Sequence, residues 1–205
     1  MVDDDGHNGW RAWAEVERAG PFSLVPTWVE APVVPDAQFV IRLDPGRAFG
    51  SGSHPTTRAT LAALAPLVRP HTSVLDVGCG SGVLAIAAAM LGGGPVVAVD
   101  VDPDAVDATA ANASVNGVDR GIHVSDRALP DLVADGHCFD VVVANLLAPV
   151  FEEHGRNLVR VLAPGGRLVA SGLLADNWRR TADALAPLAV VDLRGEQGWV
   201  ALTLT

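Results

Sequence analysis

The chain has 205 residues, of which 49% are hydrophobic and 19% charged, and its formal net charge is −10 at pH 7. This composition suits a single domain with a buried core and excludes a largely disordered chain. No apolar run approaches the roughly 20 residues that span a bilayer, and the acidic, polar start is unlike a signal peptide. We therefore expect a cytoplasmic protein that binds no membrane. The negative charge opposes direct binding to nucleic acid and favours a basic protein partner.

The first 45 residues are expected to precede the main domain. Residues 1–9 are acidic and glycine-containing, which predicts a disordered tail. Apolar residues at intervals of three predict a short helix over 10–19, and residues 21–28 and 39–43 predict the extended pieces of a small lead-in sheet. The chain is thus divided into a tail (1–9), a lead-in segment packed on the main domain (10–45) and the main domain (46–205).

A glycine-rich loop then leads into a helix. Glycines at 46, 50 and 52 precede Pro55, which is placed to begin a helix that Ser53 or His54 would cap. Leucines at 61, 64 and 67 mark the apolar face of this helix, and the proline at 70 would stop it. Its N-terminal amides, with the hydroxyls of Thr56 and Thr57, would face the ligand of the following turn and suit a carboxylate.

Residues 74–82, Val-Leu-Asp-Val-Gly-Cys-Gly-Ser-Gly, are the most informative stretch of the chain. An apolar strand runs into Gly78, Gly80 and Gly82, where missing side chains permit a sharp turn and the close approach of a ligand. A dinucleotide fingerprint would need Gly-x-Gly-x-x-Gly, but Val83 follows the third glycine and Asp76 precedes the first. Pyrophosphate binding is the weaker interpretation, and a plain βαβ glycine turn is the structural alternative.

A second apolar strand, residues 95–99, ends in Asp100. A carboxylate at this place can accept two hydrogen bonds from vicinal ribose hydroxyls. A ribose with a short tail that lacks phosphate satisfies both the acid and the glycine turn. We therefore expect S-adenosylmethionine as the cofactor. The two cysteines, Cys79 and Cys138, predict neither a disulfide nor a zinc site, and no metal is expected.

The rest of the chain alternates as a doubly wound α/β sheet requires. Asn145 follows the strand predicted over 139–144 and stands at the edge of the sheet where ligands bind, so it is a candidate contact to a ligand. The alternative is that Asn145 caps a helix beginning near Pro149. The remaining predictions are helices over 81–91, 102–116, 152–162 and 176–185, strands over 122–124 and 167–171, a helix stop at 164–166, and an antiparallel hairpin over 190–194 and 199–204.

Four segments resemble a known family. Residues 76–82 together with Asp100 resemble motifs I and II of class I methyltransferases. Residues 49–57, Phe-Gly-Ser-Gly-Ser-His-Pro-Thr-Thr, resemble Phe-Gly-Thr-Gly-x-His-Pro-Thr-Thr of the PrmA family, which methylates large-subunit ribosomal protein eleven; serines replace the usual threonines. Asn145-Leu-Leu-Ala and Ser171-Gly-Leu-Leu resemble two further PrmA segments.

This resemblance implies a fold, an activity and a set of site residues. The fold would be a doubly wound, seven-stranded, Rossmann-like class I methyltransferase sheet with a C-terminal antiparallel hairpin. The activity would be S-adenosylmethionine-dependent N-methylation of an amine, in a ribosomal or other protein or in a small molecule. The implied contacts are Gly78, Gly80 and Gly82 at the methionine moiety, Asp100 at the ribose, Thr57 at the tail, Asp126 at the adenine amino group and Asn145 at the acceptor. The motif acid Asp76 is implied as a further cofactor-binding residue.

One departure and two alternatives accompany this interpretation. PrmA carries an N-terminal substrate-recruiting domain, whereas the similarity here begins near residue 10, so we expect that domain to be missing. The resemblance of the catalytic part therefore does not identify the protein substrate. An NAD-dependent oxidoreductase would need glycine where Val83 stands. A cofactor-binding module without catalysis is the third possibility. For Asp126 alone, the alternative is an acidic loop residue that faces solvent and binds no cofactor.

Overall fold

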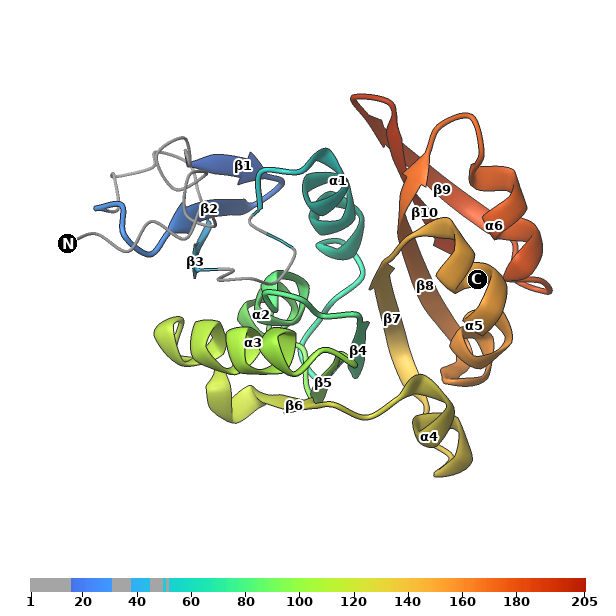
Figure 1. Cartoon of the computed structure of the whole chain (residues 1–205), viewed down its shortest axis with the longest axis horizontal. Helices are drawn as coiled ribbons and strands as arrows, with labels where there is room; N and C mark the ends of the chain where they lie inside the picture. The colour runs from blue at the N-terminus through green and yellow to red at the C-terminus, as the bar shows by residue number, and fades with distance from the viewer. Residues whose placement is uncertain (1–15, 31–37, 45–49, 51) are drawn as a thin grey trace.

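The computed structural model describes residues 16–30, 38–44, 50 and 52–205. Its smaller sheet has three strands, β1 (Glu17–Ala19), β2 (Phe22–Pro26) and β3 (Phe39–Leu43), with β1 antiparallel and β3 parallel to β2 (Figure 1). The extended pieces predicted over 21–28 and 39–43 are confirmed. Residues 17–19 pair with β2 as a strand, so the helix predicted over 10–19 is wrong at its end. Residues 1–15 lie outside the described part.

The larger sheet has seven strands in the order β6-β5-β4-β7-β8-β10-β9. Neighbouring strands are parallel except for β10, which runs antiparallel to both β8 and β9. This topology confirms the predicted doubly wound sheet with its C-terminal hairpin. The strands are β4 (Val74–Val77), β5 (Val96–Val99), β6 (Ile122–Ser125), β7 (Phe139–Asn145), β8 (Leu162–Leu174), β9 (Val190–Glu196) and β10 (Trp199–Leu204).

Six α-helices and one 3₁₀ turn are described around this sheet. Short elements escaped prediction, because α4 and η2 are too brief to show a helical period. Among the described residues, no helix is long and apolar enough to cross a membrane. The helices are α1 (Pro55–Leu64), α2 (Val83–Met90), α3 (Pro103–Val115), η2 (Asp119–Gly121), α4 (Leu129–Ala134), α5 (Ala148–Arg160) and α6 (Trp178–Ala184).

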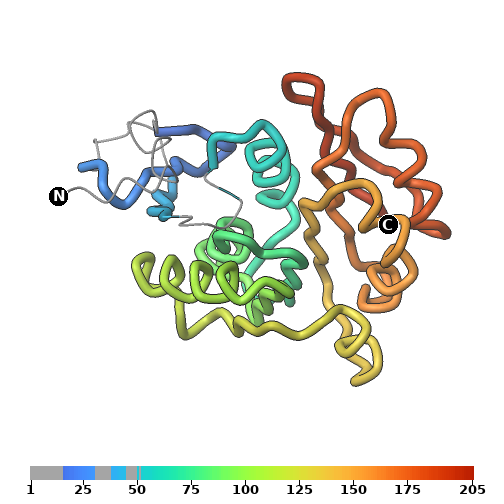
Figure 2. Tube along the Cα trace, in the orientation of Figure 1, coloured from blue at the N-terminus to red at the C-terminus, as the bar shows by residue number. Residues whose placement is uncertain are grey.

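The central strands are apolar on both faces because helices cover both. Val141 and Val143 of β7 pack in the core that includes α1, α2 and the small sheet, whereas Val142 and Ala144 pack with α4 and α5. Figure 2 shows the C-terminal hairpin (red) returning beside α1 (cyan), and α1 contacts both β9 and β10. Segments separated by more than a hundred residues thus meet at one end of the sheet.

Two predicted boundaries are wrong. The first helix ends at Leu64 instead of near residue 70. The proline-glycine stretch at 164–166 was expected to stop a helix, but α5 has already ended at Arg160 and the stretch lies within β8. There the register between β7 and β8 shifts, and Gly165 adopts a φ of 78°, so the glycines accommodate a bulge instead of a helix stop.

Candidate functional site

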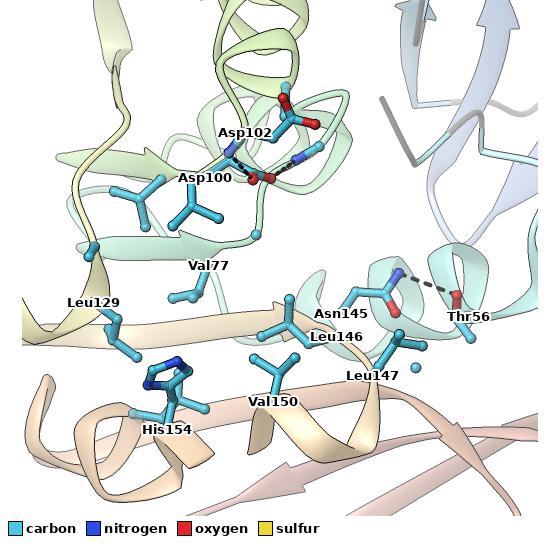
Figure 3. Close-up of a pocket in the computed structure, with 18 of the residues that line it drawn as sticks. Thr56, Val77, Asp100, Asp102, Leu129, Asn145, Leu146, Leu147, Val150 and His154 are labelled. Atoms are coloured by element: carbon cyan, nitrogen blue, oxygen red, sulfur yellow. Dashed lines mark hydrogen bonds between the residues drawn. The ribbon is translucent and has the colours of Figure 1, made fainter. Parts of the chain in front are cut away.

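A cavity of about 720 Å³ opens at the carboxyl edge of the large sheet (Figure 3). The order of the strands reverses between β4 and β7, which is where doubly wound folds bind ligands. Loops after β4, β5, β6 and β7 line the cavity, together with the start of α1 and the start of β10. Its polar lining side chains are those of His54, Thr56, Asp100, Asp102, Arg127, Asn145, His154 and Trp199.

The glycine turn has two functions in the structure. Gly78 and Gly80 line the cavity with φ values of 71° and 55°, and a Cβ at Gly78 would overlap the end of the Leu146 side chain. Gly82 instead caps α2 with a φ of 79°, and a Cβ there would lie 2.8 Å from Thr109 Cγ2. Two of the three glycines therefore line the cavity, and the third allows close packing of α2 on α3.

Asp100 presents a carboxylate that the backbone holds in place. Its Oδ2 accepts a hydrogen bond from the Gly80 N–H at 3.0 Å, and its Oδ1 accepts one from the Asp102 N–H at 3.0 Å (Figure 3). Each carboxylate oxygen has a further lone pair, so the group can accept two more hydrogen bonds. The turn and the acid are thereby locked together in a geometry suited to a diol.

Asp76 does not face the cavity as the motif had suggested. It is buried in β4, and its Oδ2 accepts a hydrogen bond from the Ala85 N–H at 3.0 Å. The helix α2 begins after Gly82, which has no capping side chain, so Asp76 supplies the missing cap from the neighbouring strand. Burial raises the pKa of the Asp76 carboxyl to about 7, and the nearby Asp100 charge adds to the rise.

Replacing Asp76 by asparagine should therefore change how stability depends on pH. The pKa of this carboxyl rises from its ordinary value of 3.8 to about 7 in the fold, so the folded state holds the proton more tightly than the unfolded chain does. Stability is then fully present below about pH 4 and falls as pH rises through about 7, by on the order of 4 kcal/mol. Asp76→Asn keeps an acceptor for Ala85 and cannot ionise. The free energy of unfolding, measured with denaturant at about pH 5 and about pH 8, should increase for the variant relative to the wild type at the higher pH. The same difference between the two proteins at both pH values would contradict the raised pKa of Asp76.

Thr57 and Asp126 are not among the described residues that line the cavity. Thr57 is fully buried, and its hydroxyl finds no hydrogen-bond partner among the described residues. Its neighbour Thr56 lines the cavity instead. Asp126 is exposed, while the four residues after it (127–130) contribute to the lining. The loop after β6 thus reaches the cavity through a largely apolar segment.

Asn145 ends β7, and its side chain lies apart from Asp100 in the cavity (Figure 3). Its Nδ2 donates to Thr56 Oγ1 at 3.3 Å, which leaves the amide oxygen as an acceptor. The alternative role in capping is excluded, because α5 begins after Leu147, whose side chain cannot cap. His54 does cap α1, as predicted: its Nδ1 accepts from the Thr56 N–H at 3.3 Å.

Several lining residues were missed from the sequence. Thr56 was expected to face the ligand and does line the cavity, whereas His54 was noted only as a helix cap and its place in the lining was missed. Trp199 reaches the cavity only because β10 returns beside β8, with Trp199 opposite Leu174, and its ring meets His54 edge-on at 5.0 Å. His154 of α5 lines the cavity too. No local pattern marked the tryptophan or this histidine.

The comparisons with known proteins point in one direction. Residues 2–205 match the family described as Ribosomal protein L11 methyltransferase (PrmA). Proteins named ribosomal protein L11 methyltransferase from Symbiobacterium thermophilum and Geobacillus kaustophilus are 42% and 38% identical to 98% of this chain, which covers 66% and 64% of their lengths. The chain covers 57% of the relative from Cupriavidus metallidurans. It therefore spans less than two thirds of the curated relatives it matches.

Solved structures agree with this result. A crystal structure of ribosomal protein L11 methylase from Lactobacillus delbrueckii subsp. bulgaricus superposes with a TM-score of 0.82 and 31% identity, covering 93% of this chain and 97% of that one. A precorrin 8W decarboxylase from Methanobacterium thermoautotrophicum superposes with a TM-score of 0.62 at 22% identity, and it shares the fold alone.

Proposed function

Because this chain belongs to the PrmA family of ribosomal protein L11 methyltransferases, we propose that it transfers a methyl group from S-adenosylmethionine to an amine of a protein. The observation that carries the proposal is the Asp100 carboxylate, fixed by two backbone N–H groups beside the glycine turn at the edge of the sheet. It supplies acceptors for a diol beside Gly78 and Gly80, which line the same cavity.

The residues of the cavity fit the cofactor. Asp100 would hold the ribose hydroxyls, and Gly78 and Gly80, which line the cavity, would lie under the methionine moiety. The buried Thr57 hydroxyl, which has no partner among the described residues, lies beside Thr56 at the N-terminus of α1 and is a candidate donor to the tail carboxylate. The largely apolar segment at 127–130, which includes the start of α4, would cover the adenine. The sheet-edge position and size of the cavity are those of ordinary cofactor sites.

The catalytic contribution of the chain would be positioning. S-adenosylmethionine supplies an electrophilic methyl group when bound. Asn145 would accept a hydrogen bond from the acceptor amine through its amide oxygen and so aim the nitrogen lone pair. The amine must be neutral to attack, so turnover should rise with pH while the resting amine is cationic. The released proton would pass to solvent.

The acceptor is proposed from chemistry and from the relatives' names. A net charge of −10 attracts a basic protein, and the relatives are named for methylating ribosomal protein L11. We take L11 as the acceptor and the cytoplasm as the place of the reaction. Calorimetric titration tests the cofactor assignment: S-adenosylmethionine and its demethylated product should bind, and NAD should not. Binding of NAD alone would favour the oxidoreductase interpretation.

Asp100→Asn should weaken the affinity for S-adenosylmethionine about tenfold, because a neutral amide replaces a charge-assisted acceptor and turns one acceptor into a donor. The fold should persist, since the amide oxygen still accepts one backbone hydrogen bond. Asp104→Asn, which removes the same charge from the exposed first turn of α3, is the matched control. Calorimetry on both variants gives the answer, and equal affinities would remove Asp100 from the ribose site.

A further inference from the structure

The side chain of Arg58 in α1 joins three segments that are far apart in the chain. Its Nε donates to Glu196 Oε1 at 2.6 Å, and its Nη1 donates to the Ser53 carbonyl oxygen at 2.6 Å and to Glu17 Oε2 at 3.3 Å. The side chain is 12% exposed. Because the donors of a guanidinium lie in one rigid plane, β1, β9 and the start of α1 are held in a fixed relation.

Two of these acceptors adjoin an aromatic pair in the cavity. Ser53 directly precedes His54, and Glu196 is the cross-strand partner of Trp199 in the β9–β10 hairpin. The rings of His54 and Trp199 meet edge to face with centroids 5.0 Å apart, and both line the cavity. One arginine therefore fixes the backbone beside each ring of the pair.

The aromatic pair is connected to Asn145. His54 Nδ1 lies 2.8 Å from Thr56 Oγ1, and that hydroxyl oxygen accepts the hydrogen bond from Asn145 Nδ2 at 3.3 Å. In Figure 3 this end of the cavity lies apart from Asp100 and Asp102. Movement of the hairpin would therefore alter the acceptor end of the cavity and spare the ribose end.

We propose that Arg58 is a positioning residue for the acceptor amine, which it serves by clamping Glu196 and Ser53 so that Trp199 and His54 frame the approach to Asn145. This inference rests on the proposed function. A displacement of about 1 Å at the reacting centre can cost on the order of a hundredfold in rate. A small change in the orientation of the hairpin should therefore lower the rate of methyl transfer. The ion pair with Glu196 is partly buried, with the Glu196 side chain 33% exposed, which limits solvent screening.

The kinetic test compares Arg58→Ala, Arg58→Lys and Glu196→Gln with wild type. Using purified ribosomal protein L11 as the acceptor, kcat/KM should fall about tenfold or more in Arg58→Ala and Glu196→Gln, and affinity for S-adenosylmethionine should stay within about threefold. Arg58→Lys should recover part of the loss, because lysine keeps the charge without the planar fork. The matched control is Arg180→Ala, which removes the arginine of an exposed ion pair between α6 and Glu152. An unchanged kcat/KM, or an equal loss of cofactor affinity, overturns the proposal.

A second readout does not depend on activity. In ¹⁵N-labelled protein, the Trp199 indole N–H signal, assigned by its disappearance in Trp199→Phe, should shift or broaden in Arg58→Ala and Glu196→Gln but not in Arg180→Ala. An unmoved signal overturns the clamp even if wild type methylates L11. A shifted signal in a protein that transfers no methyl to L11 supports the clamp and counts against the proposed acceptor.

Discussion

Asn145→Ala should cut methyl transfer by about two orders of magnitude while affinity for S-adenosylmethionine stays within a few-fold. The amide oxygen of Asn145 is the acceptor left available when Nδ2 bonds to Thr56. Removing this oxygen should therefore leave the acceptor amine poorly oriented and slow the transfer, while the cofactor still binds. Single-turnover transfer from labelled S-adenosylmethionine, together with calorimetry on the same preparation, separates these two quantities.

The matched control for this change is Asn177→Ala. Asn177 precedes α6 without a side-chain capping bond and is not among the described residues that line the cavity, so the same chemical change there should leave transfer intact. Because the N-cap position of α5 is Leu147 and not Asn145, Asn145→Ala should not show the loss of about 1 kcal/mol expected for a removed cap. A variant with wild-type turnover would end the catalytic role of Asn145.

Gly78→Val should abolish detectable binding of S-adenosylmethionine. The residue has a φ of 71°, which a branched side chain adopts only under strain. Its Cβ would displace the Leu146 side chain, which itself lines the cavity. Strain and lost space act together, so we expect the affinity to fall by about a thousandfold or more, the equivalent of at least about 4 kcal/mol.

Gly117→Val isolates the effect of strain. Gly117 has a similar φ of 68°, and a Cβ there meets no described atom within 4 Å. It follows α3, away from the cavity. Gly117→Val should lose stability in a thermal melt and keep its affinity in calorimetry. If Gly78→Val, verified as folded by circular dichroism, still bound the cofactor tightly, the glycine turn would not be its site.

Local sequence was sufficient to predict a residue at the cavity wherever that position depends only on the end of the strand that precedes the residue. The strand, the glycines and Asp100 lie within one βαβ unit, and Asn145 directly follows a strand whose continuous apolar run marks it as central. Gly78, Gly80, Asp100 and Asn145 line the cavity, and Gly82 does not. Parallel strands bring their carboxyl ends to one edge, which is why so short a pattern could place them.

Prediction failed where orientation depends on packing. The sequence favoured both Thr56 and Thr57 at the ligand, but consecutive helical residues point about 100° apart. The packing of α1 places Thr56 in the cavity lining and buries Thr57, whose contact with the cofactor's tail stays a proposal. The motif placed Asp76 with the ligand, whereas the absence of a cap on α2 assigns it to the helix. The division of the chain at residue 46 stays a prediction.

Long-range contacts were beyond any local pattern. Trp199 lies at the cavity because β10 pairs with β8, and the hairpin also packs on α1, where Arg58 and Glu196 bond across 138 residues of sequence. The strand at 17–19 similarly depends on pairing with β2, which outweighed a helical spacing of apolar residues that lie mostly outside the described part.

Methyl transfer to ribosomal protein L11 tests the central claim most directly. Wild-type protein is incubated with methyl-labelled S-adenosylmethionine and purified L11, and the label in L11 is counted and located by mass spectrometry. We predict label on an amine of L11, rising with pH while that amine is protonated at rest. A protein that binds S-adenosylmethionine yet leaves L11 unlabelled across that pH range would contradict the account.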